Sequence, residues 1–313
     1  MVQEVELSKM TDNFTHTIFV LFIGVILIPM LNFKGKQRMA YLAILLAGNA
    51  PDIDIIIRAF SAGLYLTNHR VLTHSIFGIL ALALIIMMLF SSLLKQKDYL
   101  KYFVLALVGI LAHVFLDVIT SFGTVVLYPY GLTRYAFSII PIVDIYVLAI
   151  FLIGLWFLRI HPNETSKVAK ATLFVFLVFL LFKTGLHSQA VDSVANIKDY
   201  KDVNVVPHFL NPFGWRTIVS EPDYYLISDF DLTIGGFKEF KYYPVVGNGK
   251  LEASKKSLIV RQFLEFSHSP YAMVKNNTVT WTDLRMTTDN IDSIIAEVEL
   301  DDNNNVIHES LGI

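Results

Sequence analysis

Three short patterns of histidine and aspartate contain the residues of this 313-residue chain that are best suited to chemistry. In chain order they are Pro51-Asp52-Ile53-Asp54, His69-Arg70-Val71-Leu72-Thr73-His74-Ser75 and His113-Val114-Phe115-Leu116-Asp117. The chain has no cysteine, so a metal ion could be held only by His, Asp or Glu side chains. Such ligands leave Zn, Mn, Fe and Mg as the candidate metals.

The spacing within the patterns favours metal binding. Residues four apart on a helix share one face, with Cβ atoms about 5–6 Å apart, so His113 and Asp117 can reach the same ion. A His nitrogen and a carboxylate oxygen each bind zinc at roughly 2.0–2.2 Å. Pro51 should end the preceding helix at Ala50, and the two aspartates that follow can then turn toward one cation.

Each pattern taken alone also has an ordinary structural explanation. A His and an Asp four residues apart often make a plain helix contact, and aspartates near helix ends often act as caps. Asp117 could also simply pair with His113 or Arg70. The case for a metal therefore depends on whether the elements that carry the three patterns bring them together.

Six apolar runs dominate the first part of the chain. They cover residues 18–31, 39–57, 76–94, 102–128, 139–160 and 168–186. A membrane span needs about 20 mostly apolar residues, so the last four are comfortable spans and the first two are short. The sequence therefore predicts a bundle of about six transmembrane helices.

The charges of the connecting loops predict the orientation of this bundle. The loops near residues 34–38, 95–101 and 159–170 hold nine Lys and Arg residues against two acids, Asp98 and Glu164. Short loops rich in Lys and Arg remain in the cytoplasm. We therefore expect the amino terminus and the last domain to lie outside the cytoplasm.

By this topology, the three patterns and His16 all lie toward the outer face. Asp117, for example, lies about 24 Å along its helix from Lys101 at the inner face, and the helix crosses a layer about 30 Å thick. Burying a charged side chain at such a depth costs about 3 kcal/mol or more. Such residues are therefore normally functional or paired. We expect one shared metal site there, with the ligands His16, Asp54, His69, His74, His113 and Asp117.

The last part of the chain has a different character. Residues 1–187 hold 9 acids and 14 bases, whereas residues 188–313 hold 18 acids and 11 bases, so the charges concentrate after the last span. Short strand-like runs cover 216–220, 224–234, 239–246, 278–286 and 294–300, and helices are expected at 189–199 and 257–266. We expect a membrane domain of residues 1–188 and a soluble α+β domain of residues 189–313 outside the cytoplasm.

Taken together, these motifs resemble the YdjM/YfhP-like family of metal-dependent hydrolases in bacterial inner membranes. The matching features are Thr15-His16, Pro51-Asp52-Ile53-Asp54, His69-Arg70 with Thr73-His74-Ser75, His113 to Asp117, Leu127-Tyr128-Pro129 and Asp144. Asn211-Pro212 with Trp215-Arg216, and Asp283-Leu284-Arg285, are similar to the outer domain of the YfhP-like branch. The resemblance implies a multi-pass protein of the bacterial cell membrane.

A more distant similarity concerns the order of the ligands. The order His, Asp, His and then HxxxD is similar to half of the metal cluster of zinc-dependent phospholipase C and of zinc single-strand nucleases. His16, Asp54, His69, His113 and Asp117 would be the matching positions. The chain shows no second His/HxxxE set, so the similarity implies one or two Zn²⁺ ions rather than three.

We therefore expect a membrane-embedded hydrolase that acts on a phosphoester or lipid-linked substrate at the outer face of the bilayer. A bound metal would lower the pKa of water and polarise a phosphoryl or carbonyl oxygen. The expected base is Asp52 or Asp54, whichever binds the metal less tightly, and Arg70 and Arg134 are expected to hold a phosphate.

Two other classes of function remain open. A non-enzymatic regulatory protein could use the metal structurally, in which case protein ligands would close the coordination sphere. A cation transporter is disfavoured because the polar residues do not continue to the Lys-rich side. The acidic last domain argues against binding to nucleic acid.

Overall fold

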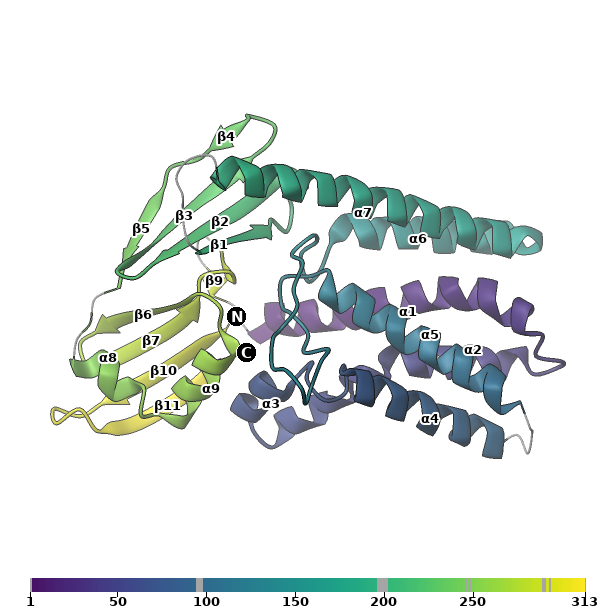
Figure 1. Cartoon of the computed structure of the whole chain (residues 1–313), viewed down its shortest axis with the longest axis horizontal. Helices are drawn as coiled ribbons and strands as arrows, with labels where there is room; N and C mark the ends of the chain where they lie inside the picture. Colours follow the sequence, from purple (N-terminus) through teal and green to yellow (C-terminus); the bar gives the residue numbers. More distant parts are fainter. Residues whose placement is uncertain are drawn as a thin grey trace. The chain divides into compact units, whose positions relative to one another are not determined.

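The chain folds into two compact units (Figure 1). The computed structural model describes residues 2–93, 98–195, 202–245, 247, 249–288, 291–292 and 294–312. One unit, here called the helical unit, consists of Glu6–Asp54 and Arg70–Gly185. The other, here called the mixed unit, is built mainly from Ile55–His69 and Leu186–Ile313.

The helical unit confirms the predicted membrane bundle. Its helices are α1 (Val2–Leu31), α2 (Gln37–Asn49), α4 (Ile76–Leu93), α5 (Tyr99–Val118), α6 (Ile145–Ile160) and most of α7 (Thr165–Ala195). Within the described residues, five segments are long and apolar enough to cross a membrane, and α6 is a shorter apolar helix of 16 residues. The six helices correspond to the six predicted runs.

The second predicted span changes its helical form where the first aspartate pattern begins. The α-helix α2 ends at Asn49, and a 3₁₀ helix, η1, continues from Ala50 to Ala59. Pro51 has no backbone N–H to donate to the preceding turn, so the α-helical bonding cannot continue through it. The tighter 3₁₀ geometry sets the directions of Asp52 and Asp54, where an irregular segment was predicted.

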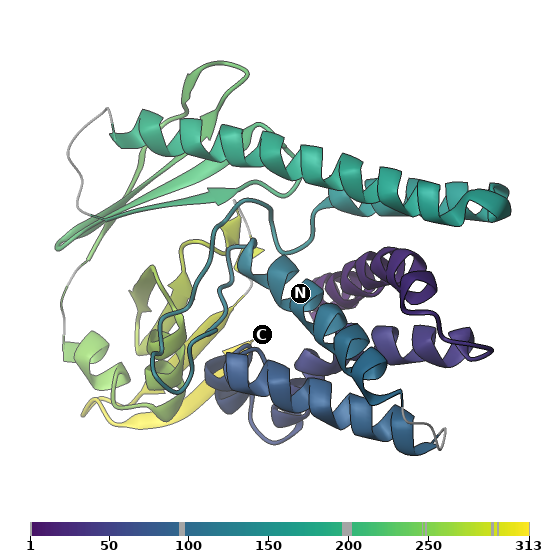
Figure 2. The same cartoon turned by 45° about the vertical axis from the view of Figure 1, so that its right-hand side comes forward.

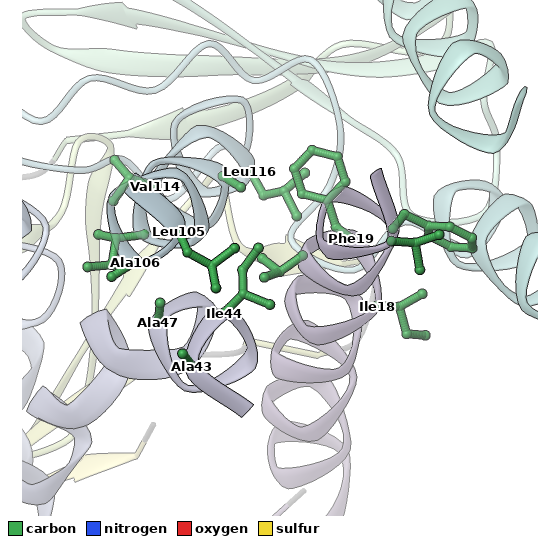
Figure 3. Packing of buried hydrophobic residues seen from close by; sticks show 14 of the residues in the cluster. Ile18, Phe19, Ala43, Ile44, Ala47, Leu105, Ala106, Val114 and Leu116 are labelled. Carbon is green, nitrogen blue, oxygen red and sulfur yellow. The ribbon is translucent and has the colours of Figure 1, made fainter. Parts of the chain in front are cut away.

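Small residues allow the helices that carry the site to approach closely. A Cβ atom on Gly48 of α2 would lie 2.6 Å from Val20 Cγ2 of α1, and one on Gly109 of α5 would lie 3.0 Å from Ala47 Cβ of α2. Such contacts are typical of helix pairs in membranes. The core between these helices includes Ile44 and Leu105, and Figure 3 shows both side chains with their neighbours.

A long connection between α5 and α6 is tied back to the segment between α3 (Ala62–Asn68) and α4. The N–H of Val125 donates to the carbonyl of Arg70 at 2.9 Å, and the N–H of Ile76 donates to the carbonyl of Val126 at 3.0 Å. Within the connection, Thr124 and Tyr135 form an isolated antiparallel bridge that joins its two halves. The backbone around Arg70 is therefore fixed by sheet-like bonds although it belongs to no helix or strand.

The mixed unit contains two antiparallel sheets, as the α+β prediction requires. The first has the order β1-β2-β3-β4, with β5 also on β3, and the second has the order β11-β10-β7-β6. Their strands are β1 (Asp202–Pro207), β2 (Gly214–Glu221), β3 (Tyr224–Asp231), β4 (Gly236–Phe237), β5 (Lys241–Pro244), β6 (Pro270–Lys275), β7 (Thr278–Asp283), β10 (Ile295–Leu300) and β11 (Val306–Gly312). A short pair, β8 (Thr287–Thr288) and β9 (Ile291–Asp292), and the helices α8 (Gly249–Ser254) and α9 (Leu258–Phe266) complete the unit.

The strands predicted at 216–220, 224–234, 239–246, 278–286 and 294–300 match β2, β3, β5, β7 and β10, and the helix predicted at 257–266 matches α9. The helix predicted at 189–199 is the end of α7, which runs without interruption from Thr165 to Ala195; residues 196–199 lie outside the described part. Strands β1, β6 and β11 and the two-residue strands β4, β8 and β9 were not predicted. Trp215 of β2 is fully buried beside Ala190 and Val194 of α7, so the last turns of α7 form part of the core of this unit.

Segment 55–69 was expected within the membrane domain, but it packs with the mixed unit. Its helix α3 lies against α9, and Gly63 leaves the space that the side chain of Gln262 fills. The domain limits of 1–188 and 189–313 remain a prediction. The two compact units are defined by contacts within the chain, and these contacts do not show where the membrane ends.

The ion pairs of Asp229 predict a pH dependence of the mixed unit. Burial alone would raise the pKa of Asp229, but the hydrogen bond from His208 and the charges of His208 and Arg216 lower this pKa from 3.8 to about 2. A lowered pKa stabilises the fold above pH 3.8, and this stability is lost as the pH falls toward 2. Asp229→Asn should lower the free energy of unfolding by about 2 kcal/mol at neutral pH.

The measurement is urea unfolding of the detergent-purified full chain, followed by the fluorescence of Trp215 and Trp281, at several pH values. The difference between wild type and Asp229→Asn should shrink as the pH falls from about 4 to about 2. Asp223→Asn, at an exposed aspartate of the same sheet region, is the control. A difference that does not depend on pH would contradict the assignment.

Candidate metal centre

Four side chains of the helical unit converge on one buried point. The Nε2 atoms of His74 and His113 lie 3.3 Å apart, and Asp117 Oδ2 lies 3.0 Å from the first and 3.3 Å from the second. Asp52 Oδ1 lies 3.6 Å from His74 Nε2 and 3.4 Å from His113 Nε2. In a tetrahedral site with metal–ligand distances near 2.0–2.1 Å, neighbouring ligand atoms are about 3.3 Å apart. The observed separations match the edges of such a tetrahedron.

The second nitrogen of each imidazole has its own hydrogen-bond partner. His113 Nδ1 lies 2.8 Å from the carbonyl oxygen of Gly48, which can only accept, so this nitrogen carries the proton. Thr73 donates its hydroxyl proton to Asp54 Oδ2 at 3.1 Å, and the same hydroxyl oxygen lies 3.0 Å from His74 Nδ1. The hydroxyl therefore accepts from His74, which assigns its proton to Nδ1 as well.

With both imidazoles neutral, these assignments leave the two Nε2 atoms facing each other with lone pairs only. Two lone pairs at 3.3 Å in a buried site repel unless a cation lies between them. Both oxygens of Asp117 are buried; Oδ1 faces the Arg70 guanidinium at 2.7 Å, whereas Oδ2 faces the two Nε2 atoms. The two Nε2 atoms and Asp117 Oδ2 therefore lie around a common centre, as metal ligands do.

The charges around this centre also fit a divalent cation. Three carboxylates, those of Asp52, Asp54 and Asp117, face one guanidinium, that of Arg70, whose Nη2 lies 2.7 Å from Asp117 Oδ1. With neutral imidazoles, two negative charges remain without compensation within this group. Buried charge is costly unless it is paired or coordinates a metal, and a dication would neutralise the cluster.

Arg70 also joins three parts of the site. Its backbone N–H donates to Asp54 Oδ2 at 3.2 Å, and its Nη1 donates to Thr120 Oγ1 at 3.4 Å. The guanidinium lies over the ring of Phe122, 5.1 Å from its centroid. Arg70 adopts a positive φ of 60°, a conformation that costs free energy in a residue with a side chain and persists where surrounding contacts impose it.

The structure also brings His16 to this cluster. The His16 ring stacks on His113 with centroids 4.0 Å apart, and its Nε2 lies 3.4 Å from Asp117 Oδ1. His16 is held by α1, which is joined to α2 nearby by the bond from Thr17 Oγ1 to Asn49 Oδ1. His16, Asp52, Asp54, His74, His113 and Asp117 thus lie together in the helical unit, and their roles as ligands or as base remain predictions.

The remaining predicted residues have other positions. His69 belongs to the mixed unit, where it ends α3 and stacks on Tyr65 at 4.7 Å; its role as a ligand remains a prediction. Asp144 caps α6, because its Oδ1 accepts from the N–H groups of residues 146 and 147 at 2.8 and 3.0 Å. His187 stacks on Trp215 at 4.9 Å in the mixed unit.

Sequence reasoning missed two positions that orient the imidazoles. Gly48 contributes a backbone carbonyl, which no side-chain pattern reveals, although its place just before the Pro51 break was a signal. Thr73 was not assigned a role in the site, whereas its hydroxyl connects Asp54 to His74. Its position directly before His74 was the available signal.

Comparisons with known proteins agree with this architecture. Residues 10–190 match the family model described as YdjM inner membrane protein, and residues 250–313 match that of the YfhP C-terminal alpha/beta plait domain. The chain is 25% identical over 271 residues to the uncharacterized protein YfhP of Bacillus subtilis (strain 168), covering 82% of this chain and 80% of that protein. No solved structure matches the chain.

The geometry predicts which substitutions remove a bound metal. His113→Ala and Asp117→Ala each delete a ligand atom at the centre and should abolish stoichiometric metal in the purified protein. Asp144→Ala deletes a helix cap outside the cluster and should retain it. Metal per chain is measured by inductively coupled plasma mass spectrometry. Stoichiometric metal in His113→Ala would exclude this centre.

Thr73 gives a matched test of the orienting bonds. Thr73→Val removes the hydroxyl that connects Asp54 and His74 but preserves the shape of the side chain, whereas Thr73→Ser retains the hydroxyl. Loss of such an orienting partner typically weakens metal binding about 10–100-fold. We expect that loss for Val and nearly normal affinity for Ser, measured by competition with a metal chelator. Equal affinities would contradict the chain of bonds.

Proposed function

The chain belongs to the YdjM inner membrane protein family, and on that premise we propose that it is a membrane-embedded, metal-dependent hydrolase. The observation that supports this proposal best is the pair of imidazole nitrogens that face each other at 3.3 Å with two carboxylates around them. The proposed cofactor is a divalent cation, with Zn²⁺ favoured by the His and Asp ligands.

The four candidate ligands differ in how far their side chains are exposed to solvent. The side chains of His74, His113 and Asp117 are at most 1% exposed, whereas that of Asp52 is 17% exposed. Catalytic zinc sites commonly have three protein ligands and one position open to water or substrate. We assign His74, His113 and Asp117 as the permanent ligands and place the open position on the side of Asp52.

When bound, a divalent cation lowers the pKa of water and polarises a phosphoryl or carbonyl oxygen. Asp52 is the proposed base, because its carboxylate is at the exposed corner where water enters. Asp54 is instead a positioning residue, since its Oδ2 already accepts from Arg70 and Thr73. This division corresponds to the sequence expectation that the less tightly held aspartate acts as base.

The two arginines have different proposed roles. Arg70 positions Asp117, to which its Nη2 lies at 2.7 Å. Arg134 lies in the α5–α6 connection, beside Gly123, where a Cβ atom would lie 3.0 Å from Arg134 Cβ. A guanidinium in this place suits the oxygens of a phosphoester, so Arg134 is the proposed group that binds the anion and Arg70 supports it.

Exposed apolar side chains in the helical unit favour a lipid-linked substrate. Leu72 is 60% exposed and precedes His74 by two residues. In the α5–α6 connection, Tyr130 is 86% and Leu132 is 71% exposed, and Tyr130 lies against Phe77 of α4 with ring centroids 5.9 Å apart. Apolar groups beside a polar centre would admit a substrate that has an acyl or isoprenoid chain. The loop charges further support an active site at the outer face.

The structural alternative has one observation in its favour, the position of Asp52 Oδ1 at the fourth corner of the tetrahedron. A permanently bound Asp52 would close the coordination sphere, as in structural metal sites. The protein would then be a regulatory or structural membrane protein. The two functions differ in whether water or a substrate analogue can reach the metal.

The test is hydrolysis of a chromogenic phosphodiester and of phospholipids by the full chain in nanodiscs, with and without added Zn²⁺. Asp52→Asn should lower kcat about 10²–10⁴-fold, the range for loss of a general base, while metal per chain is retained. Asp98→Asn, in an exposed ion pair with Lys101, is the control and should be fully active. A metal-loaded wild type without turnover and without exchangeable water at the metal would favour the structural alternative.

A further inference from the structure

Four large apolar side chains are exposed on two loops of the mixed unit. Phe209, Leu210 and Phe213 lie on the loop between β1 and β2, with 48%, 66% and 37% of their surface exposed. Ile234 lies on the turn between β3 and β4 and is 68% exposed. These four residues are called the apolar tip here.

Hydrogen bonds join the two loops into one structure. The N–H of Leu232 donates to the carbonyl of Phe213 at 3.1 Å, and Asn211 Nδ2 donates to Asp231 Oδ2 at 2.9 Å. Asn211 Oδ1 in turn accepts from the N–H of Phe213 at 3.0 Å, which closes a turn. The apolar tip is therefore held in a fixed arrangement with its side chains outward.

The loop that carries most of the apolar tip begins close to His187, where the apolar stretch of α7 ends. His187 of α7 stacks on Trp215 at 4.9 Å, and Trp215 pairs with Pro207 at the end of the β1–β2 ladder, where the loop begins. Figures 1 and 2 both show β1 and β2 beside the C-terminal part of α7. Leu181, 64% exposed on the membrane-spanning part of α7, is six residues or about 9 Å along the helix from His187.

From this placement we infer that the apolar tip inserts into the interfacial layer of the leaflet at which α7 leaves the membrane. The tip starts beside His187, which directly follows the apolar stretch of α7 that would face lipid in a membrane. Polar groups lie next to the tip: His208 directly precedes Phe209 and pairs with Asp229, which also faces Arg216 and the 58% exposed side chain of Lys238. Apolar side chains beside cationic and amide groups are typical of segments that lie at the headgroup level.

The absence of cysteine makes the inference directly testable. Single variants Leu210→Cys and Ile234→Cys are labelled with an environment-sensitive fluorophore and reconstituted as full chains into phosphatidylcholine–phosphatidylglycerol nanodiscs. Leu181→Cys is the lipid-facing reference. Ile307→Cys, 60% exposed on β11 of the other sheet, is the matched control for an exposed apolar position.

Lipids with a nitroxide near the headgroup should quench the fluorophore at positions 210 and 234 as strongly as at position 181. Lipids with the nitroxide near the chain end should quench at position 181 but much less at the tip, because insertion is shallow. The Ile307→Cys label should be unaffected by either lipid. A tip label that behaves like this control would overturn the inference. A label shielded from aqueous iodide but not quenched by either lipid would also overturn it, and would indicate that a protein covers the tip.

Discussion

Two buried imidazole nitrogens that face each other at 3.3 Å impose the main constraint on the helical unit. The backbone carbonyl of Gly48 and the hydroxyl of Thr73 hold the protons of His113 and His74 on the opposite side of each ring. Four different segments are needed to produce this arrangement: α2, η1, the α3–α4 connection and α5. A cation at the centre would contribute to the stability of the bundle as well as to chemistry, because binding to the folded state alone favours that state.

The helix contacts show how the sequence builds this arrangement. Gly48 and Gly109 allow α1, α2 and α5 to approach so closely that a carbonyl of one helix reaches the imidazole of another. Pro51 ends the α-helical bonding at the one place where two aspartates must turn inward. The backbone bonds from the α5–α6 connection to residues 70 and 76 then fix the irregular segment that holds His74. The polar centre therefore depends on apolar packing and on backbone bonds in equal measure.

Much of this could be predicted from the sequence, and the remainder depended on contacts that a sequence does not display. The apolar runs are long and carry few charges, so the bundle was predictable from hydropathy, and the pairing of His113 with Asp117 followed from helical spacing. The role of Gly48 depends on its carbonyl, which every residue has, so only its place just before Pro51 could have suggested it. Segment 55–69 joined the mixed unit because Gly63 meets Gln262, a contact nearly 200 residues apart in sequence. Strands β6 and β11 are the two edges of their sheet and have no buried side chains, so the alternation of apolar and polar residues that marks a strand is weak in them.

The different hydrogen-bond partners of the two imidazoles have a consequence for their strength as donors. His74 is backed, through Thr73, by the negative charge of Asp54, whereas His113 is backed by a neutral peptide carbonyl. An imidazole whose N–H is hydrogen-bonded toward a carboxylate is more basic than one whose N–H is bonded to a peptide carbonyl. The two nitrogens are thus unequal electron donors, and an ion between them would be bound asymmetrically, more strongly by His74.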